Sequence, residues 1–210
     1  MSDPDPIIYV VEDDDISRRL IVALSDSIGV ACRQFADAAE FLDNFDIGQG
    51  GCLVLDVFMP GMSGLQLQCE LNRRGAIIPV IFVTGNTQVP DVVAAMREGA
   101  FNYMIKPFAH GELLNNLRLA LSLDRNNRRL LEQCDEIRAR ILSLTPRERE
   151  VLELLARGFP NKVMAHEMRL SERTVELHRA RVMEKMGAGS LAQLVRMVMD
   201  FEHRQKAARH

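Results

Sequence analysis

The segment "IIYVVEDDDIS" (Ile7–Ser17) places four acidic residues directly after five apolar ones. A short, continuous apolar run that is rich in β-branched residues is typical of a strand buried on both faces of a sheet. The four carboxylates that follow, at positions 12 to 15, repel one another at neutral pH, and each costs free energy if it is buried without a partner. The segment therefore predicts either four solvated side chains or a site at which some of them hold a cation.

Four further short apolar runs follow, and segments with the apolar spacing of amphipathic helices separate them. The runs are Val30–Gln34, Cys52–Val57, Val80–Val83 and Phe101–Met104. Strict alternation of strands and helices predicts right-handed β-α-β crossovers and a parallel sheet, hence a small doubly wound α/β domain. In such folds the binding site lies at the carboxyl ends of the strands.

Charge is distributed unevenly along the 210 residues, although the net charge is only -3. Residues 1–123 carry 8 basic and 16 acidic side chains, whereas residues 140–210 carry 14 basic and 9 acidic ones. An acidic part joined to a basic part predicts two domains with different partners. The basic part is the one expected to face nucleic acid.

Targeting and membrane segments are not expected in this chain. The acidic, proline-containing start lacks the basic region of a signal peptide, and no apolar run approaches the ~20 residues of a membrane span. The four cysteines are widely spaced and include no C-x-x-C pair, so they are expected to be reduced core residues. Together these features favour a cytoplasmic protein with no membrane partner.

The segment from Glu112 to Thr145 contains neither glycine nor proline, and its apolar residues keep helical spacing. It predicts one long helix that continues the last helix of the first domain into the second. Its polar middle, "DRNNRR" (Asp124–Arg129), is expected to be solvated between the domains. Pairing with a second copy stays open, because a coiled coil normally needs three to four clean heptads and this stretch has fewer.

Helix signals replace strand signals after residue 145. "TPREREVLELLARG" begins with the predicted N-cap Thr145, has a glutamate three residues later as in a capping box, and ends at Gly158. Helices are also predicted for "NKVMAHEM", for "SERTVELHRARVMEKMG" with Ser171 as its N-cap, and for "SLAQLVRMVMDF". Two short helices joined by a tight turn are typical of a helix-turn-helix.

Polar residues at the strand ends of the first domain predict a site for a cation and a phosphoryl group. Glu12 and Asp13 follow the first strand, Asp56 ends the third, Thr84 ends the fourth and Lys106 follows the fifth. Mg²⁺ prefers hard oxygen ligands, and a carboxylate beside it can attack phosphorus to form an acyl phosphate. A hydroxyl and an ammonium group can then hold the phosphoryl oxygens.

These residues, with "MPG" after Asp56 and proline after Lys106, resemble the receiver domain of two-component response regulators. The resemblance implies a flavodoxin-like sheet of order 2-1-3-4-5 and makes Asp56 the phosphoacceptor. It implies Mg²⁺ held directly by Asp13, Asp56 and the backbone carbonyl of Phe58, with Glu12 acting through water. The residue three before the lysine, Tyr103, is implied to be the aromatic switch that responds to Thr84. Asp14 and Asp15 are expected only to start a helix, where negative charge suits the dipole.

The basic part resembles a LuxR-type helix-turn-helix domain in "LTPREREVLELLARG", "NKVMAHEM" and "LSERTVELHRARVMEKMGAGSLAQLV". Together with a receiver, it resembles the NarL/FixJ family, and the "IYVVEDD" start favours the FixJ branch. The third helix of this part is expected to enter the major groove of double-stranded DNA. The residues expected to contact DNA are Asn161, Lys162, Arg173, Thr174, Glu176, Leu177, Arg179, Ala180, Arg181 and Lys185. Pro160 replaces the serine that is common before Asn-Lys, which removes a hydroxyl cap.

The sequence therefore predicts a receiver domain at residues 1–122, a helical linker at 123–142 and a four-helix DNA-binding domain at 143–210. The expected function is that of a transcription regulator and not of an enzyme. A histidine kinase is expected to phosphorylate Asp56, which promotes formation of a homodimer and DNA binding; RNA polymerase is a further candidate partner.

Two alternatives stand beside this prediction. A Mg²⁺-dependent phosphatase built on the same type of sheet needs a second acid two residues after its nucleophile, and that position is Phe58. A regulator that dimerises and binds DNA without phosphorylation does not need the complete set of acid, threonine and lysine. Both alternatives are thus disfavoured by particular residues.

Overall fold

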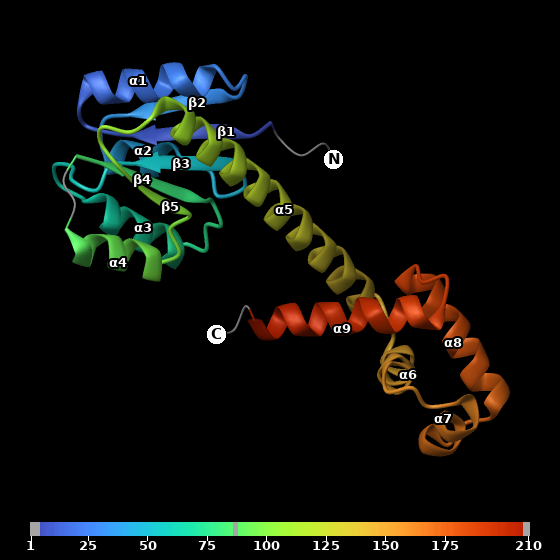
Figure 1. Ribbon diagram of the computed structural model, residues 1–210. Coiled ribbons are helices and arrows are strands. Elements are labelled where there is room, and N and C mark those ends of the chain that lie inside the picture. Colours follow the sequence, from blue (N-terminus) through green and yellow to red (C-terminus); the bar gives the residue numbers. More distant parts are fainter. Residues whose placement is uncertain (1–4, 86–87, 208–210) are drawn as a thin grey trace. The chain divides into compact units, whose positions relative to one another are not determined.

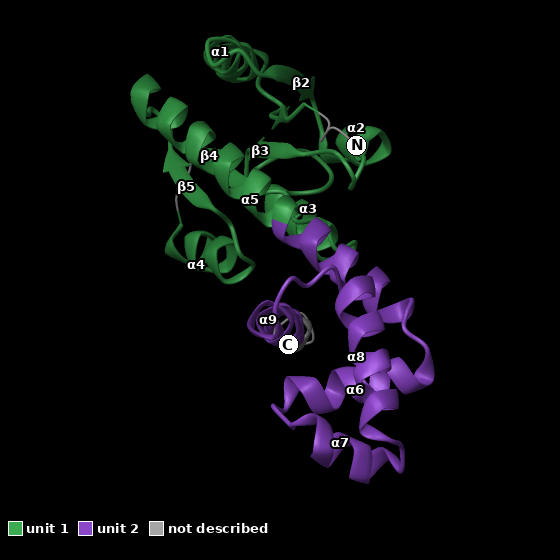
Figure 2. Ribbon diagram, turned by 90° about the vertical axis from the view of Figure 1, so that its right-hand side faces the viewer, with its two compact units in different colours: residues 1–129 green, residues 130–210 purple. Residues whose placement is uncertain are grey.

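The computed structural model describes residues 5–85 and 88–207, and it divides into two compact units, residues 1–129 and 130–210 (Figure 2). The boundary between them falls inside one long helix, α5 (His110–Leu142). The long linking helix predicted from the absence of glycine and proline is therefore confirmed.

Unit 1 is built on a parallel five-stranded sheet of order β2-β1-β3-β4-β5, as predicted (Figure 1). The strands are β1 (Ile7–Val11), β2 (Ala31–Phe35), β3 (Gly51–Leu55), β4 (Val80–Thr84) and β5 (Asn102–Ile105). The bounds of β1 match the prediction, and those of the other strands differ from it by one or two residues at an end. Pairing is in register, with Val11 opposite both Phe35 and Leu55.

Helices cover both faces of the sheet, which explains why its strands are apolar on both sides. Ile8 and Val10 point to the face covered by α1 (Asp15–Asp26) and α5, while Tyr9 and Val11 point to the other face. That second face is covered by α2 (Ala38–Asn44), α3 (Gly64–Arg73) and α4 (Val89–Arg97). All four of these β1 side chains are at most 1% exposed, and burial of each contributes about 1.5–3 kcal/mol.

The polar middle of α5 was expected to be solvated, which holds for Arg125, Asn126 and Arg129 but was wrong for Asp124 and Arg128. Asp124 is 2% exposed, and its Oδ2 accepts a hydrogen bond of 2.8 Å from the backbone N–H of Gly51 at the start of β3. Arg128 donates from Nε to the same carboxylate at 3.0 Å and from Nη1 to the carbonyl of Gly48 at 2.8 Å. The pair is stable at this depth because each group has several partners, and it fastens α5 to the amino end of the sheet.

Unit 2 contains the end of α5 and the helices α6 (Pro146–Ala156), α7 (Asn161–Met168), α8 (Glu172–Met186) and α9 (Leu191–Ala207). The predicted caps are confirmed: Thr145 and Glu148 form a capping box, Ser171 caps α8, and Gly187 ends α8 with a left-handed φ of 64°. Val151, Val175 and Val182 lie in one core, against which Ile137 and Ile141 of α5 also pack.

Two further expectations concern membranes and thiols. None of the helices in the described part of the chain is long and apolar enough to cross a bilayer. All four cysteines are free; Cys52 is buried, whereas Cys69 is exposed on α3, so the expectation of a core position was wrong for Cys69. Burial raises the pKa of Cys32 to about 11, which keeps that thiol protonated at neutral pH.

Candidate functional site

Three carboxylates meet at the carboxyl end of the sheet in unit 1. Glu12 and Asp13 lie in the loop between β1 and α1, and Asp56 directly follows β3. One carboxylate oxygen from each lies within 4.8 Å of the others, although 43 residues separate Asp13 from Asp56 in sequence (56 minus 13). Glu12 and Asp56 are 1% and 7% exposed, and Asp13 is exposed. The structure thus brings together the acids that the sequence placed at different strand ends.

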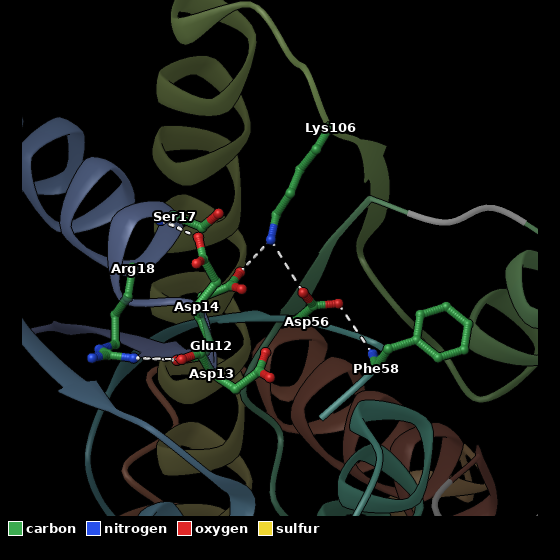
Figure 3. Close-up of polar contacts among 8 residues, drawn as sticks. All are labelled: Glu12, Asp13, Asp14, Ser17, Arg18, Asp56, Phe58 and Lys106. Carbon is green, nitrogen blue, oxygen red and sulfur yellow. Dashed lines mark hydrogen bonds and ion pairs between the residues drawn. The ribbon is translucent and has the colours of Figure 1, made fainter. Parts of the chain in front are cut away.

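Lys106 follows β5 and reaches into this cluster (Figure 3). Its Nζ donates to Oε2 of Glu12 at 2.6 Å and to Oδ2 of Asp56 at 3.1 Å. The other oxygen of Asp56, Oδ1, accepts from the backbone N–H of Phe58 at 3.1 Å. The Phe58 ring is 45% exposed and points away from Glu12 and Asp13. Asp56 is therefore held from two sides in one orientation.

The charges in this cluster shift its pKa values. Burial raises the pKa of Glu12 to about 7; the hydrogen bond from Lys106 opposes this rise, and the negative charge of Asp56 adds to it. Burial lowers the pKa of Lys106, but the hydrogen bond to Glu12 and the charges of Asp56 and Glu12 outweigh burial, so its pKa is raised overall. The lysine stays protonated, and the cluster still carries excess negative charge.

The donor set suits a hard divalent cation. All three side chains offer oxygen, and Oε1 of Glu12 is buried without a hydrogen-bond partner among residues 5–85 and 88–207. Mg²⁺ is commonly bound by one or two carboxylates and several waters, and the exposed position of Asp13 leaves one side of the cluster open to water. The residues present therefore fit such an ion.

The other two acids of the opening segment serve the start of α1, as predicted. Asp14 is the N-cap, and its Oδ2 accepts from the backbone N–H of Ser17 at 2.8 Å. Hydrogen bonding by Ser17, first through its side chain and then through its backbone N–H, lowers the pKa of Asp14. Asp15 lies in the first turn and forms ion pairs with Arg18 at 2.7 Å and Arg19 at 2.9 Å. Both roles satisfy the unpaired N–H groups and positive dipole of a helix start.

Thr84 and Tyr103, the two residues expected to respond to phosphorylation, lie on neighbouring strands. Thr84 is the last residue of β4 and is fully buried. Tyr103 lies on β5, half-buried, with its ring centroid 5.9 Å from that of Phe82. The Tyr103 hydroxyl oxygen is buried and has no hydrogen-bond partner in the part of the chain that the structure describes. Burial, with the charges of Asp91 and Asp56, raises the pKa of Tyr103.

Helices α7 and α8 of unit 2 form the expected helix-turn-helix. Ser171 Oγ accepts from the backbone N–H of Thr174 at 3.1 Å and so begins α8. One face of α8 is buried through Val175, Val182 and Met186, which the sequence predicted as core. The residues predicted to contact DNA that are exposed on α7 and α8 are Lys162, Arg173, Glu176, Leu177, Ala180, Arg181 and Lys185. An exposed face of basic and apolar side chains opposite a buried one is what a groove-binding helix needs.

Four of the predicted DNA-contacting residues, Asn161, Thr174, Arg179 and Lys185, already have side-chain partners within unit 2. Arg179 donates from Nη1 to Oδ1 of Asn161 at 2.9 Å, which joins α8 to the start of α7. Lys185 donates from Nζ to Oε2 of Glu148 at 2.7 Å, which joins the end of α8 to α6. Glu148 is 2% exposed, and hydrogen bonds from Lys185 and then from the backbone N–H of Thr145 lower its pKa to about 2. A structural role for Glu148 beyond its cap was missed, because its partner lies 37 residues away.

A receiver-like sheet with an acidic site, joined to a helix-turn-helix unit, is the architecture of response regulators, and the comparisons agree. Residues 8–118 match the family described as "Response regulator receiver domain", and residues 142–198 match "Bacterial regulatory proteins, luxR family". Transcriptional regulatory protein FixJ of Azorhizobium caulinodans is 43% identical over 192 residues, which cover 91% of each chain. Response regulator protein TmoT of Ectopseudomonas mendocina is 40% identical, over 94% of this chain and 90% of its own.

A solved structure also spans most of the chain. The response regulator StyR has a TM-score of 0.85 at 39% identity and covers 93% of this chain and 98% of its own. The chain belongs to the NarL/FixJ family of two-component response regulators, which control transcription.

Proposed function

We propose that Asp56 is the phosphoacceptor of this response regulator and that Glu12, Asp13, Asp56 and the backbone carbonyl of Phe58 hold Mg²⁺ during the transfer. The observation that carries this proposal is the convergence of three carboxylates within 4.8 Å beside an ammonium group that contacts Asp56 at 3.1 Å. When bound, the cation neutralises charge on the phosphoryl oxygens. The phosphoryl donor is a phosphohistidine of a histidine kinase.

The residues of this chain account for the transfer step. A carboxylate oxygen of Asp56 forms the O–P bond while the P–N bond of the phosphohistidine breaks, and the electron pair stays with the imidazole nitrogen. The Phe58 N–H and Lys106 Nζ hold Asp56 in one orientation before the step, so little reorganisation is needed. Lys106 then exchanges a carboxylate oxygen for a phosphoryl oxygen, which is also a charge-assisted hydrogen bond.

The switch that follows uses Thr84 and Tyr103. The Thr84 hydroxyl moves toward the phosphoryl group. The ring of Tyr103 then turns inward, into the space that the Thr84 hydroxyl has vacated. The buried, unpartnered hydroxyl of Tyr103 supports this step, because a buried polar atom without a partner disfavours the conformation that holds it. Phosphorylation thus biases two conformations of the receiver.

The surface formed by α4, β5 and α5 is the proposed dimer interface. Large apolar side chains are exposed on it: Val89 at 74%, Val93 at 41%, Met96 at 48%, Ile105 at 52% and Leu119 at 51%. A cluster of this kind marks an interaction surface more often than scattered single residues do. A dimer presents two copies of α8 to adjacent half-sites of double-stranded DNA, where RNA polymerase is a further candidate partner.

On α7 and α8, the proposed DNA contacts divide by chemistry. Lys162, Arg173, Thr174 and Arg181 bind phosphates, which position the helix. Glu176, Leu177 and Ala180 face base edges; Glu176 accepts from a cytosine amino group. Residues 1–122 act as the receiver, 123–142 as the linker and 143–210 as the DNA-binding domain.

One experiment tests the receiver half. The purified chain is incubated with a small phosphodonor and Mg²⁺, and its intact mass and oligomeric state are measured beside Asp56→Asn. We expect one acid-stable, base-labile phosphoryl adduct and a dimer in the parent chain, and neither in the variant. An equal adduct in both proteins rejects the site; dimers that form equally without phosphodonor favour the phosphorylation-independent regulator.

A further inference from the structure

We propose that Arg18 is a positioning residue for the cation site: its guanidinium clamps the backbone of the loop after β1 so that the carboxylates of Glu12 and Asp13 stay where a divalent cation needs them. This inference rests on the proposed function of the same site and assigns a role to a residue outside the ligand set. Arg18 lies one turn into α1, and its side chain is 15% exposed.

The clamp consists of three contacts from one guanidinium group. Nη1 donates to the backbone carbonyl of Glu12 at 2.7 Å and to that of Asp13 at 3.3 Å. Nη2 donates to Oδ1 of Asp15 at 2.7 Å, which fixes the guanidinium from the helix side. Figure 3 shows the contact between Arg18 and Glu12 on the side of the loop away from Lys106. The side chains of Arg18 and Lys106 therefore hold the loop after β1 from different sides.

Arg18 binds carbonyl oxygens, whereas Lys106 binds carboxylate oxygens. A cation that binds Glu12 and Asp13 through their side chains therefore does not compete with Arg18 for ligand atoms. The peptide group is planar, so a hydrogen bond to the Glu12 carbonyl also fixes the direction in which the chain enters Asp13. This matters most for Asp13, because its carboxylate has no hydrogen bond or ion pair among the described residues that would fix it otherwise.

The neighbouring Arg19 provides a control that distinguishes the effect of the Arg18 contacts from the effect of positive charge alone. Arg19 pairs with Oδ2 of Asp15 at 2.9 Å, so it resembles Arg18 in charge and in its acidic partner. Its side chain is 77% exposed, and it makes no contact with the loop carbonyls. If only positive charge mattered, the two arginines would have similar effects on the site. If the hydrogen bonds to the loop carbonyls matter, only replacement of Arg18 affects the cation site.

Full-length parent, Arg18→Gln, Arg18→Lys and Arg19→Gln are titrated with Mg²⁺ and, separately, with Ca²⁺ by calorimetry. Loss of a positive charge alone should tighten cation binding slightly, so Arg19→Gln is expected to bind as well as the parent or better. Arg18→Gln is expected to bind Mg²⁺ about 10–100-fold more weakly, the usual loss when a group that orients metal ligands is removed. Arg18→Lys keeps the charge but not the fork of two donor nitrogens, so an intermediate loss is expected.

The ratio of the two affinities distinguishes positioning from general destabilisation. Mg²⁺ demands near-ideal octahedral geometry, whereas Ca²⁺ tolerates irregular sites. Arg18→Gln is therefore expected to lose more affinity for Mg²⁺ than for Ca²⁺, and a variant that is merely less stable changes both equally. Arg18→Lys is the second variant should Arg18→Gln not fold.

The outcomes separate this inference from the proposed function. A parent chain that does not bind Mg²⁺ rejects the proposed function itself. A parent that binds Mg²⁺, with both Arg18 variants matching Arg19→Gln or with an unchanged Mg²⁺ to Ca²⁺ ratio, overturns the clamp alone.

Discussion

The acidic cluster of unit 1 and the exposed face of α8 in unit 2 are the two proposed functional sites, and they are built differently. The cluster joins Glu12, Asp56 and Lys106 from three strand ends, and 94 residues separate the two that make the shortest contact. The α8 face lies on one continuous helix whose opposite side is core. A single substitution should therefore abolish cation binding by the acidic cluster, because each of its members is needed. A single substitution on α8 should only weaken DNA binding, because many side chains along one helix share the contact.

The largest expected effect is the loss of Mg²⁺ binding when one carboxylate of the acidic cluster is replaced. Asp13→Asn removes the charge of a predicted ligand without changing its size, and Mg²⁺ binding should be lost in calorimetric titration. Asp14→Asn removes a charge from the same run of acids, but asparagine caps a helix as well as aspartate does, so binding should persist. Equal loss in both variants would show that the summed charge of the run matters and not the geometry of the cluster.

The second effect concerns the anchor of α5 on unit 1. Asp124→Ala leaves the Gly51 N–H without its partner and removes the only carboxylate that faces the partly buried Arg128 among the described residues, so it should lower the free energy of unfolding by about 3 kcal/mol. Arg19→Gln is the matched control in the same unit, because the Arg19–Asp15 pair is exposed and should contribute at most about 1 kcal/mol. Tyr9 and Tyr103 are the only tyrosines and there is no tryptophan, so tyrosine fluorescence in a urea titration reports unit 1 alone.

Unit 2 offers a comparable test at Glu148. Glu148→Gln keeps the capping box, since glutamine also serves at that position, and removes only the charge that faces Lys185. The pKa of Glu148 falls from 4.5 to about 2 on folding, so its charge stabilises the folded unit fully above pH 4.5, and this contribution disappears as the pH falls to about 2. Parent and variant should therefore differ in urea midpoint, measured by far-UV circular dichroism, near neutral pH and converge in acid. A difference that persists at the lowest pH would contradict this role for the charge.

Graded loss is the expectation for α8. Arg173→Ala should weaken binding to all DNA sequences and make the salt dependence shallower by about one unit of slope, because one phosphate contact is lost. Lys185→Met should lower the stability of unit 2 and change the salt slope less, since its ammonium contacts Glu148 at 2.7 Å. Fluorescence anisotropy of labelled DNA across salt concentrations measures both slopes. Identical salt slopes for the two variants would show that Lys185 also contacts a DNA phosphate.

The smallest effect lies in the turn between α7 and α8. Arg169 caps α7 with a left-handed φ of 54°, a conformation that costs a non-glycine residue about 1 kcal/mol. Arg169→Gly should therefore raise the stability of unit 2 by up to about 1 kcal/mol, less the entropy that glycine adds to the unfolded chain. Chemical unfolding followed by far-UV circular dichroism checks this, and a clear destabilisation would mean that the arginine side chain makes a compensating contact.

Much of this molecule could be predicted from its sequence, because the deciding signals are local. The apolar run Ile7–Val11 coincides with β1, and Thr145 and Ser171 cap the helices that they were expected to cap. The convergence of Glu12, Asp56 and Lys106 followed from one general property of parallel sheets, namely that strand ends meet at one edge.

What could not be predicted depends on partners far away in the chain. Asp124 was expected to be solvated because its neighbours in sequence are polar, but its partner Gly51 lies 73 residues away. The ion pair between Glu148 and Lys185 could not be predicted for the same reason, and the capping box had already given Glu148 a role. Arg18 lies in an ordinary helical turn, and only the path of the folded loop shows that its guanidinium reaches two carbonyls.

The location of the phosphoryl group tests the central claim most directly. The chain is phosphorylated with a small phosphodonor and Mg²⁺, reduced with borohydride to convert an acyl phosphate into a stable alcohol, and digested for peptide mass analysis. We expect the conversion at Asp56, where the Phe58 N–H and Lys106 Nζ hold the carboxylate. Conversion at Asp13 or another carboxylate in place of Asp56, or a phosphoryl group that resists base and borohydride, would contradict the account.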